Sequence, residues 1–166
     1  MAEKKNKAET AVETKRTVPK DVDLNEYVTV RNGFPGTLVY QSSRTGEIFK
    51  WEGFGDEQDM ELRELKNAKN SNKKFFENNW FVFDEDWIVD FLGVERMYRH
   101  AVKLDKFDEL FSKKPAEIKK IIAAMSKGQK RSVAYRARQL IKESAIDSNS
   151  LIRTLEECLG VELIER

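Results

Sequence analysis

Residues 37–51, TLVYQSSRTGEIFKW, indicate a β-hairpin and set the fold class of the first half of the chain. Two arms rich in β-branched and aromatic residues flank a short polar connection, in which Gly46 can adopt positive φ. In the second arm, the alternation of a strand places Phe49 and Trp51 on one face and Ile48 on the other. We therefore expect an antiparallel hairpin with one aromatic face.

Two further segments of the first half are expected to be strands. Residues 27–30, YVTV, are β-rich and precede the turn signals Asn32-Gly33 and Pro35-Gly36. The sequence WFVF at 80–83 belongs to the most hydrophobic stretch of the chain. It predicts a strand that completes a small sheet.

Acidic residues mark two expected helix starts in the same half. Asp56 can cap a helix that runs to about Ala68, because carboxylates favour the positive end of a helix dipole. Residues 84–86, DED, open a second, short helix that Gly93 stops.

The last third of the chain has helical periodicity throughout. Pro115 suits the first turn of one helix, which Gly128 is expected to interrupt. Another helix is expected from about 129 to 145. Asp147 caps the last helix, and Gly160 lies just past its end.

These patterns predict an α+β fold, with a small antiparallel β-sheet and helices in the N-terminal half and an all-helical C-terminal half. Residues 1–20 have almost no apolar side chain to bury and are expected to be a flexible basic arm. Residues 21–99 are expected to form a small α+β unit with the aromatic hairpin. Residues 100–166 are expected to form a helical unit with a basic helix.

Charge is segregated along the chain. Residues 113–142 carry ten basic side chains and one acid, Glu117, in a protein of net charge +1. Residues 21–100 hold 10 basic and 16 acidic groups, and residues 101–166 hold 14 and 10. A chain sorted in this way presents faces of opposite sign, which suit binding or assembly.

The basic helix has an apolar arc and a basic flank when its residues are placed at 100° intervals. The candidate binding residues for a nucleic acid or an acidic partner are Lys127, Lys130, Arg131, Tyr135, Arg138 and Lys142. Arginines at seven-residue spacing beside an aromatic side chain can grip successive phosphates or hold carboxylates in guanidinium forks. Two other interpretations stay open, a solvated helix whose charges only maintain solubility and a helix–turn–helix over 116–142.

The aromatic face of the hairpin also has two interpretations. Tyr40, Phe49 and Trp51 can form the core of the small sheet, or they can dock onto another protein chain as interface anchors. We keep the three as candidate interface residues. A nucleic-acid platform is disfavoured here, because the net acidic charge of residues 21–100 repels phosphates.

No residue set identifies a reaction, so we expect no enzyme activity, no cofactor, no metal site and no small-molecule substrate. His100 is the only histidine, and Cys158, the only cysteine, falls beside an apolar stripe. Neither of the phosphate-binding patterns GxxxxGK[ST] and GxGxxG occurs. No apolar run approaches the roughly 18 residues that span a bilayer, and no secretory signal is present, so we expect a cytoplasmic protein without membrane contact.

Two stretches carry a resemblance to a known group of proteins. Residues 38–47, with Trp51, Phe54-Gly55 and NNWF at 78–81, resemble small, poorly characterised bacteriophage proteins grouped with virion structural genes. The stretch SKGQKRSVAYRAR at 126–138, with Ile146-Asp-Ser148, has the same character.

The resemblance spans roughly residues 26–164 and carries over no catalytic residue. It implies a non-enzymatic structural or assembly adaptor of a phage particle that binds other protein subunits, located in the host cytoplasm and then in the virion. The alternative is a sequence-nonspecific nucleic-acid-binding protein that uses the basic 113–142 helices. A small regulator of an enzyme is the third interpretation.

Overall fold

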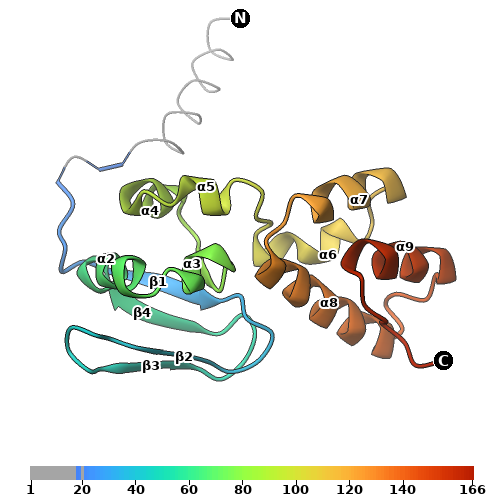
Figure 1. The fold of residues 1–166 in the computed structure, drawn as a ribbon, viewed down its shortest axis with the longest axis horizontal. Coiled ribbons are helices and arrows are strands. Elements are labelled where there is room, and N and C mark those ends of the chain that lie inside the picture. Colours follow the sequence, from blue (N-terminus) through green and yellow to red (C-terminus); the bar gives the residue numbers. More distant parts are fainter. Residues whose placement is uncertain (1–17, 20) are drawn as a thin grey trace, which may run out of the picture.

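The computed structural model describes residues 18, 19 and 21–166, so the expected basic arm lies almost wholly outside the described residues. The fold is α+β, as expected from the sequence. Strands lie between residues 27 and 83, and the part after residue 100 that the structure describes is built from helices. Figure 1 shows the two halves side by side, with the sheets in one and α6 to α9 in the other.

A three-stranded antiparallel sheet, in the order β4-β1-β5, forms the centre of the N-terminal half. Its strands are β1 (Tyr27–Asn32), β4 (Glu57–Glu61) and β5 (Phe81–Phe83). β1 pairs Val28 with Met60 and Val30 with Phe83, and all four side chains are buried. The strand expected over 80–83 is therefore confirmed, and it joins β1.

The hairpin is confirmed as β2 (Leu38–Gln41) and β3 (Ile48–Trp51), with Gly46 in its turn at φ 77°. It forms a separate two-stranded sheet. The Trp51 indole Nε1 donates a hydrogen bond of 2.9 Å to the Val30 carbonyl oxygen and so fastens the hairpin to β1. Trp51 is 1% exposed and Ile48 is 62% exposed, as the alternation of faces predicts.

The helix prediction from Asp56 was wrong over residues 57–61, which form β4; the helix α2 spans Leu62–Ser71. Pairing with β1 satisfies the backbone of these residues and buries Met60 beside Val28. Such long-range pairing overrides a local preference for a helix start. The Asp56 carboxylate instead accepts a hydrogen bond of 2.9 Å from the Gly53 amide and closes a turn.

Short helices and aromatic side chains complete this half. The helices are α3 (Lys74–Glu77), α4 (Asp86–Leu92) and α5 (Glu95–Tyr98). Gly93 ends α4 at φ 70°, as expected. The rings of Tyr40, Phe75 and Phe81 pack together in the core, with centroids 4.9 to 5.7 Å apart. In Figure 1, α4 and α5 lie at the top of this half and the hairpin at the bottom.

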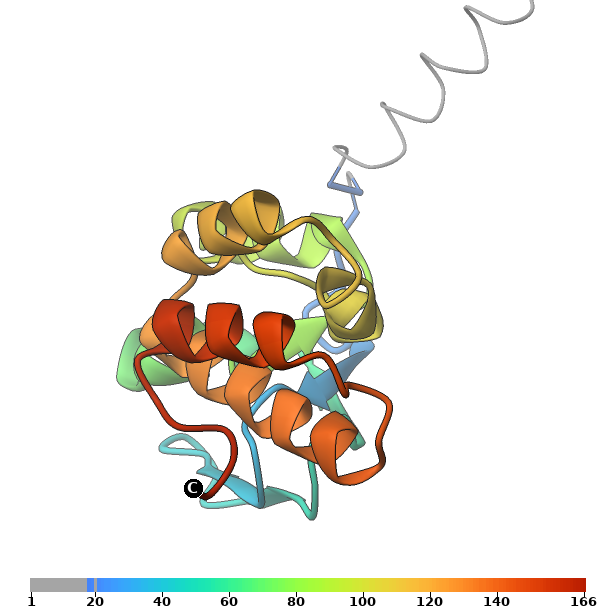
Figure 2. The same ribbon diagram turned by 90° about the vertical axis from the view of Figure 1, so that its right-hand side faces the viewer.

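The C-terminal half is a compact group of helices. They are the 3-10 helix η1 (Leu104–Lys106), α6 (Phe107–Leu110), α7 (Pro115–Ala123), α8 (Lys127–Lys142) and α9 (Asn149–Leu159). α9 packs against both α7 and α8, and Figure 2 shows it in front of α8. Pro115 opens α7 and Gly160 ends α9 at φ 67°, as the sequence predicts.

Several helix boundaries differ from the expectation. The helix expected to run to about residue 145 is α8, which ends at Lys142. Gly128 does not interrupt a helix but lies in the first turn of α8, because the Ser126 hydroxyl accepts a hydrogen bond from the Gln129 amide and caps the helix. Likewise Ser148 caps α9, not Asp147.

The two halves have separate hydrophobic cores, and they meet through polar contacts and through Phe54, which packs on Phe107 and Tyr135. Gly128 packs directly on Asn78, where an added Cβ would come well inside 3.0 Å of backbone atoms. Ser126 donates a hydrogen bond of 2.7 Å to the Asn79 side chain, and Ser132 donates one to the Gly33 carbonyl. The Gln129 side chain bonds both backbone groups of Val102 at 2.8 Å. These contacts fix how α8 sits on the sheet half.

Candidate binding groove on the basic helix

The helix α8 turns its small and branched side chains inward and its cations outward. Val133 and Ala137 are fully buried in the core of the C-terminal half, and Ala134 and Leu140 lie beside them. Lys127, Arg131, Arg138 and Lys142 are exposed and Lys130 is half-buried. The helical period therefore sorts the residues as the sequence predicted.

A groove of about 560 Å³ runs along α8, between this helix and the segment that follows α9. Its four basic side chains are Lys127, Lys130, Arg131 and Arg138, and its other lining residues are Pro35, Ala134, Tyr135, Leu159 and Val161. Val161 is 40% exposed. The groove thus combines an apolar floor with a cationic wall.

The cations of this groove lack acidic partners. Within the described residues, no Asp or Glu oxygen lies within 4.0 Å of the charged nitrogens of Lys127, Lys130, Arg131, Arg138 or Lys142. Arg138 donates a hydrogen bond of 2.9 Å to the backbone carbonyl of Glu162, which positions the chain after α9 without neutralising the charge. Arg136, by contrast, bonds both oxygens of Asp108 at 2.9 Å. These bonds hold the pKa of the Asp108 carboxyl below its ordinary value.

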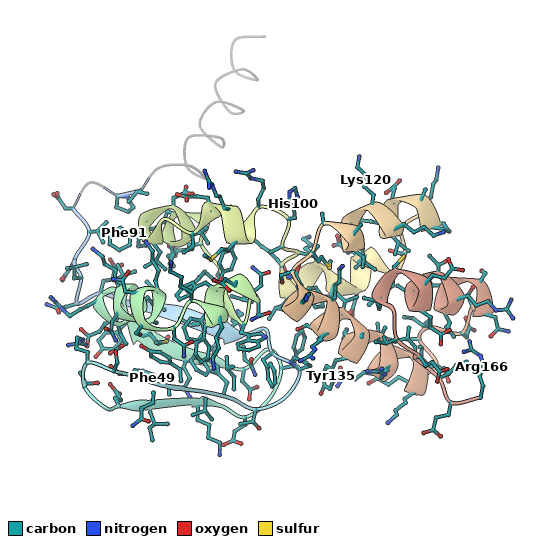
Figure 3. The ribbon with its side chains drawn as sticks, in the orientation of Figure 1. Phe49, Phe91, His100, Lys120, Tyr135 and Arg166 are labelled. Carbon is teal, nitrogen blue, oxygen red and sulfur yellow. The ribbon has the colours of Figure 1, made fainter. Side chains whose placement is uncertain are left out.

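The structure brings together five of the six residues predicted for this site. Lys127, Lys130, Arg131 and Arg138 line the groove, with Tyr135 at its edge. Tyr135 is half-buried against Phe54, with ring centroids 5.8 Å apart, and Figure 3 shows it between the two halves. Lys142, at the end of α8, is outside the lining of the groove.

A larger cleft of about 900 Å³ lies between the halves, on the other side of Tyr135. Its cations are already paired. Arg31 bonds Asp84 at 2.8 Å, Arg136 bonds Asp108, and Lys103 lies 3.0 Å from Asp86. Because these three cations already have acidic partners, this cleft offers less to an acidic ligand than the groove does. Sequence reasoning did not find it, since its walls come from segments that are far apart in the chain.

The predicted aromatic interface residues are mostly interior. Tyr40 and Trp51 are each 1% exposed, and Phe49 is half-buried against the same core. A partner could reach Tyr40 or Trp51 only by opening that core. Their position argues against an interface role for these two residues and favours the core interpretation.

Sequence reasoning missed a buried carboxylate, Glu64, which is 2% exposed on α2. It accepts hydrogen bonds from Tyr40 at 2.8 Å, Ser42 at 2.7 Å, Asn67 at 3.1 Å and Arg44 at 3.3 Å. Burial raises its pKa, but the hydrogen bonds and the Arg44 charge prevail and leave the pKa below the ordinary value. Glu64 fastens the hairpin to α2. Its side chain is enclosed, so its role is structural.

The single histidine and the single cysteine lie apart from the groove. His100 is exposed on the segment between the halves, as Figure 3 shows. Cys158 is half-buried, and burial raises the pKa of its thiol. Among the described residues, no three His, Cys, Asp or Glu side chains converge where they could hold a metal ion. None of the described helices has the length and apolar character needed to cross a membrane.

Comparisons with protein-family models, with curated proteins and with solved structures found no match to this chain. The resemblance to bacteriophage virion proteins therefore stays a prediction.

Proposed function

We propose that this protein is a non-enzymatic adaptor that docks an acidic segment of a protein partner in the α8 groove. One observation carries the proposal. An exposed apolar side chain, Val161, lies in a groove that is lined by four cations and by no acidic side chain. A role in a phage particle is supported only by the sequence resemblance to bacteriophage proteins.

The groove is lined by both apolar and basic side chains, and this combination determines which kind of ligand fits best. Unpaired lysines and arginines attract acidic side chains and orient them, mainly through the rate of association and the choice of partner. An apolar contact with Val161 and Leu159 adds burial, which phosphate groups cannot supply. A segment that carries carboxylates around an apolar side chain matches both features.

Binding can be measured with a fluorescent oligoglutamate peptide that has one central leucine. We expect the double change Arg131→Glu and Arg138→Glu to weaken binding by about tenfold or more, because it reverses two charges of the groove. Val161→Ser should weaken it by a smaller factor, since it removes apolar contact alone. Fluorescence anisotropy at about 50 mM salt gives the dissociation constants.

The matched control is the double change Lys113→Glu and Lys120→Glu. Both lysines are exposed and neither lines the groove, and Figure 3 shows Lys120 on α7, well away from Tyr135. The control has the same net charge as the groove variant and should bind the peptide several-fold more tightly. Equal losses in the two variants would mean that net charge, and not the groove, attracts the peptide.

Nucleic acid is the second candidate ligand, favoured by the row of unpaired cations on one helix. Titration of single-stranded and duplex DNA at about 50 and about 200 mM salt tests it, because phosphate binding weakens by orders of magnitude across that range. Val161→Ser separates the two candidates. It should leave DNA affinity unchanged, whereas it lowers affinity for the leucine-containing peptide.

A further inference from the structure

We propose that the acidic partner of the groove is a second copy of this chain, which presents the outer face of its three-stranded sheet. This inference rests on the proposed function, since it names the partner of the same groove. The two surfaces lie on different halves of the molecule, so each copy can offer its sheet to one neighbour and its groove to another.

The outer face of the sheet is a ladder of cross-strand pairs with acids along one strand. β1 and β4 place Tyr27 opposite Glu61, Thr29 opposite Asp59 and Arg31 opposite Glu57. The paired side chains interact at 3.4, 3.1 and 3.1 Å. Tyr27, Glu57 and Asp59 are exposed and the other three are half-buried, whereas Val28, Val30 and Met60 point the other way, into the core.

Charge on this face is of the opposite sign to that of the groove. Only Glu57 of the three acids on β4 has a cationic partner, Arg31; Asp59 and Glu61 have none within 4.0 Å among the described residues. The charge of Glu61, with a smaller effect of Glu47, raises the pKa of the Tyr27 hydroxyl. Negative charge therefore gathers around an aromatic side chain.

The two surfaces are also similar in length, and each holds an exposed apolar side chain. Alternate residues of a strand are about 6.6 Å apart, so Glu57 to Glu61 spans about 13 Å. On a helix with a rise of about 1.5 Å per residue, Lys127 to Arg131 spans about 6 Å and Lys127 to Arg138 about 16 Å. Tyr27 is 64% exposed on the acidic face and Val161 is 40% exposed in the groove. An acidic ladder with an exposed ring is thus the counterpart of a cationic groove with an exposed valine.

The two surfaces do not neutralise one another within one copy. Contacts of α8 and of its capping residue with Gly33, Asn78 and Asn79 hold the helix in place on the sheet half. In the described residues, no ion pair joins the cations of the groove to the acids of β4. Contact between the two surfaces consequently requires two molecules.

Two charge-reversal variants test the proposal by sedimentation and light scattering. The groove variant carries Arg131→Glu and Arg138→Glu, and the face variant carries Asp59→Lys and Glu61→Lys. We expect the unchanged protein to self-associate at about 50 mM salt and to dissociate as salt rises. Each variant alone should be monomeric, with self-association weakened by about tenfold or more.

An equimolar mixture of the two variants is the decisive sample. The intact sheet of the groove variant can enter the intact groove of the face variant, so the mixture should regain the association that each variant alone has lost. That recovery would also show that both variants are folded. The neutral changes Asp59→Asn and Glu61→Gln should weaken self-association less, and the Lys113→Glu and Lys120→Glu control should associate as the unchanged protein does.

The outcomes separate this inference from the proposed function. A monomeric unchanged protein whose groove binds the oligoglutamate peptide overturns the second copy as partner and leaves the adaptor function standing. A monomeric protein that does not bind the peptide removes both. Self-association that neither variant weakens shows that copies meet through other surfaces, and it overturns the inference as well.

Discussion

Replacement of Glu64 by leucine is expected to lower the free energy of unfolding by about 3–5 kcal/mol. Leucine has a similar size but accepts no hydrogen bond. Tyr40 and Ser42 are residues that are 1% and 3% exposed, and their hydroxyls would lose their acceptor inside the protein. Urea denaturation followed by tryptophan fluorescence measures the loss, because all three tryptophans lie between residues 51 and 87.

The matched control for this change is Glu77→Leu. Glu77 is exposed on α3, and its replacement should alter the free energy of unfolding by no more than about 0.5 kcal/mol. If the two variants were equally stable, the hydrogen-bonded cluster around Glu64 would have no net stabilising effect.

The same carboxylate makes stability depend on pH in a defined direction. The pKa of Glu64 is lower in the folded protein than its ordinary value of 4.5. Its contribution is therefore fully present above the unfolded pKa and is lost as the pH falls through the folded pKa. The difference in the free energy of unfolding between the unchanged protein and Glu64→Gln should decrease from about pH 7 to about pH 3. A difference that stays constant over this range would exclude a lowered pKa of Glu64.

Gly128→Ala is expected to destabilise the protein by about 2–4 kcal/mol, although alanine is the better helix former by about 1 kcal/mol. The new Cβ would come well inside 3.0 Å of the Cα, Cβ and carbonyl oxygen of Asn78. The backbone at Asn78 or at residue 128 must shift to make room for the Cβ, and this shift would disturb the junction between the halves. Urea denaturation followed by both fluorescence and far-ultraviolet circular dichroism measures the effect.

Gly53→Ala serves as the control for this second change. A Cβ at Gly53 would meet its nearest neighbour, the Asp56 carboxylate, at an ordinary 3.8 Å. For Gly128→Ala, fluorescence reports the sheet half and circular dichroism reports mainly the helices, so a weakened junction should separate the two transitions. A stabilised Gly128→Ala protein would show that helix propensity outweighs the close contact.

Local signals in the sequence were sufficient for much of the fold. The hairpin follows from the composition of its two arms and from Gly46 in the connection. The helix ends at Gly93 and Gly160 follow from the need for a residue that tolerates positive φ. Such features depend on residues close together in the chain, and the structure confirms each of them.

Other features depend on distant residues and could not be predicted. Residues 57–61 carry acids that suit a helix start, and only pairing with β1 makes them a strand. Gly128 looks like a helix breaker until Asn78 is placed against it. In the groove, the cations of α8 were predictable from charge alone. The apolar part of the groove was not predictable, because Pro35 and Val161 contribute to it from segments that are far apart in the sequence.

The contact of Gly128 with Asn78 has a consequence for any string of copies joined from sheet to groove. The two docking surfaces belong to different halves, and that contact helps to set the angle between the halves, together with the hydrogen bonds of Ser126 and Ser132. Each added copy would then be turned by the same amount relative to the one before. The pitch of such a filament, or the number of copies in a closed circle, would thus depend on these few contacts.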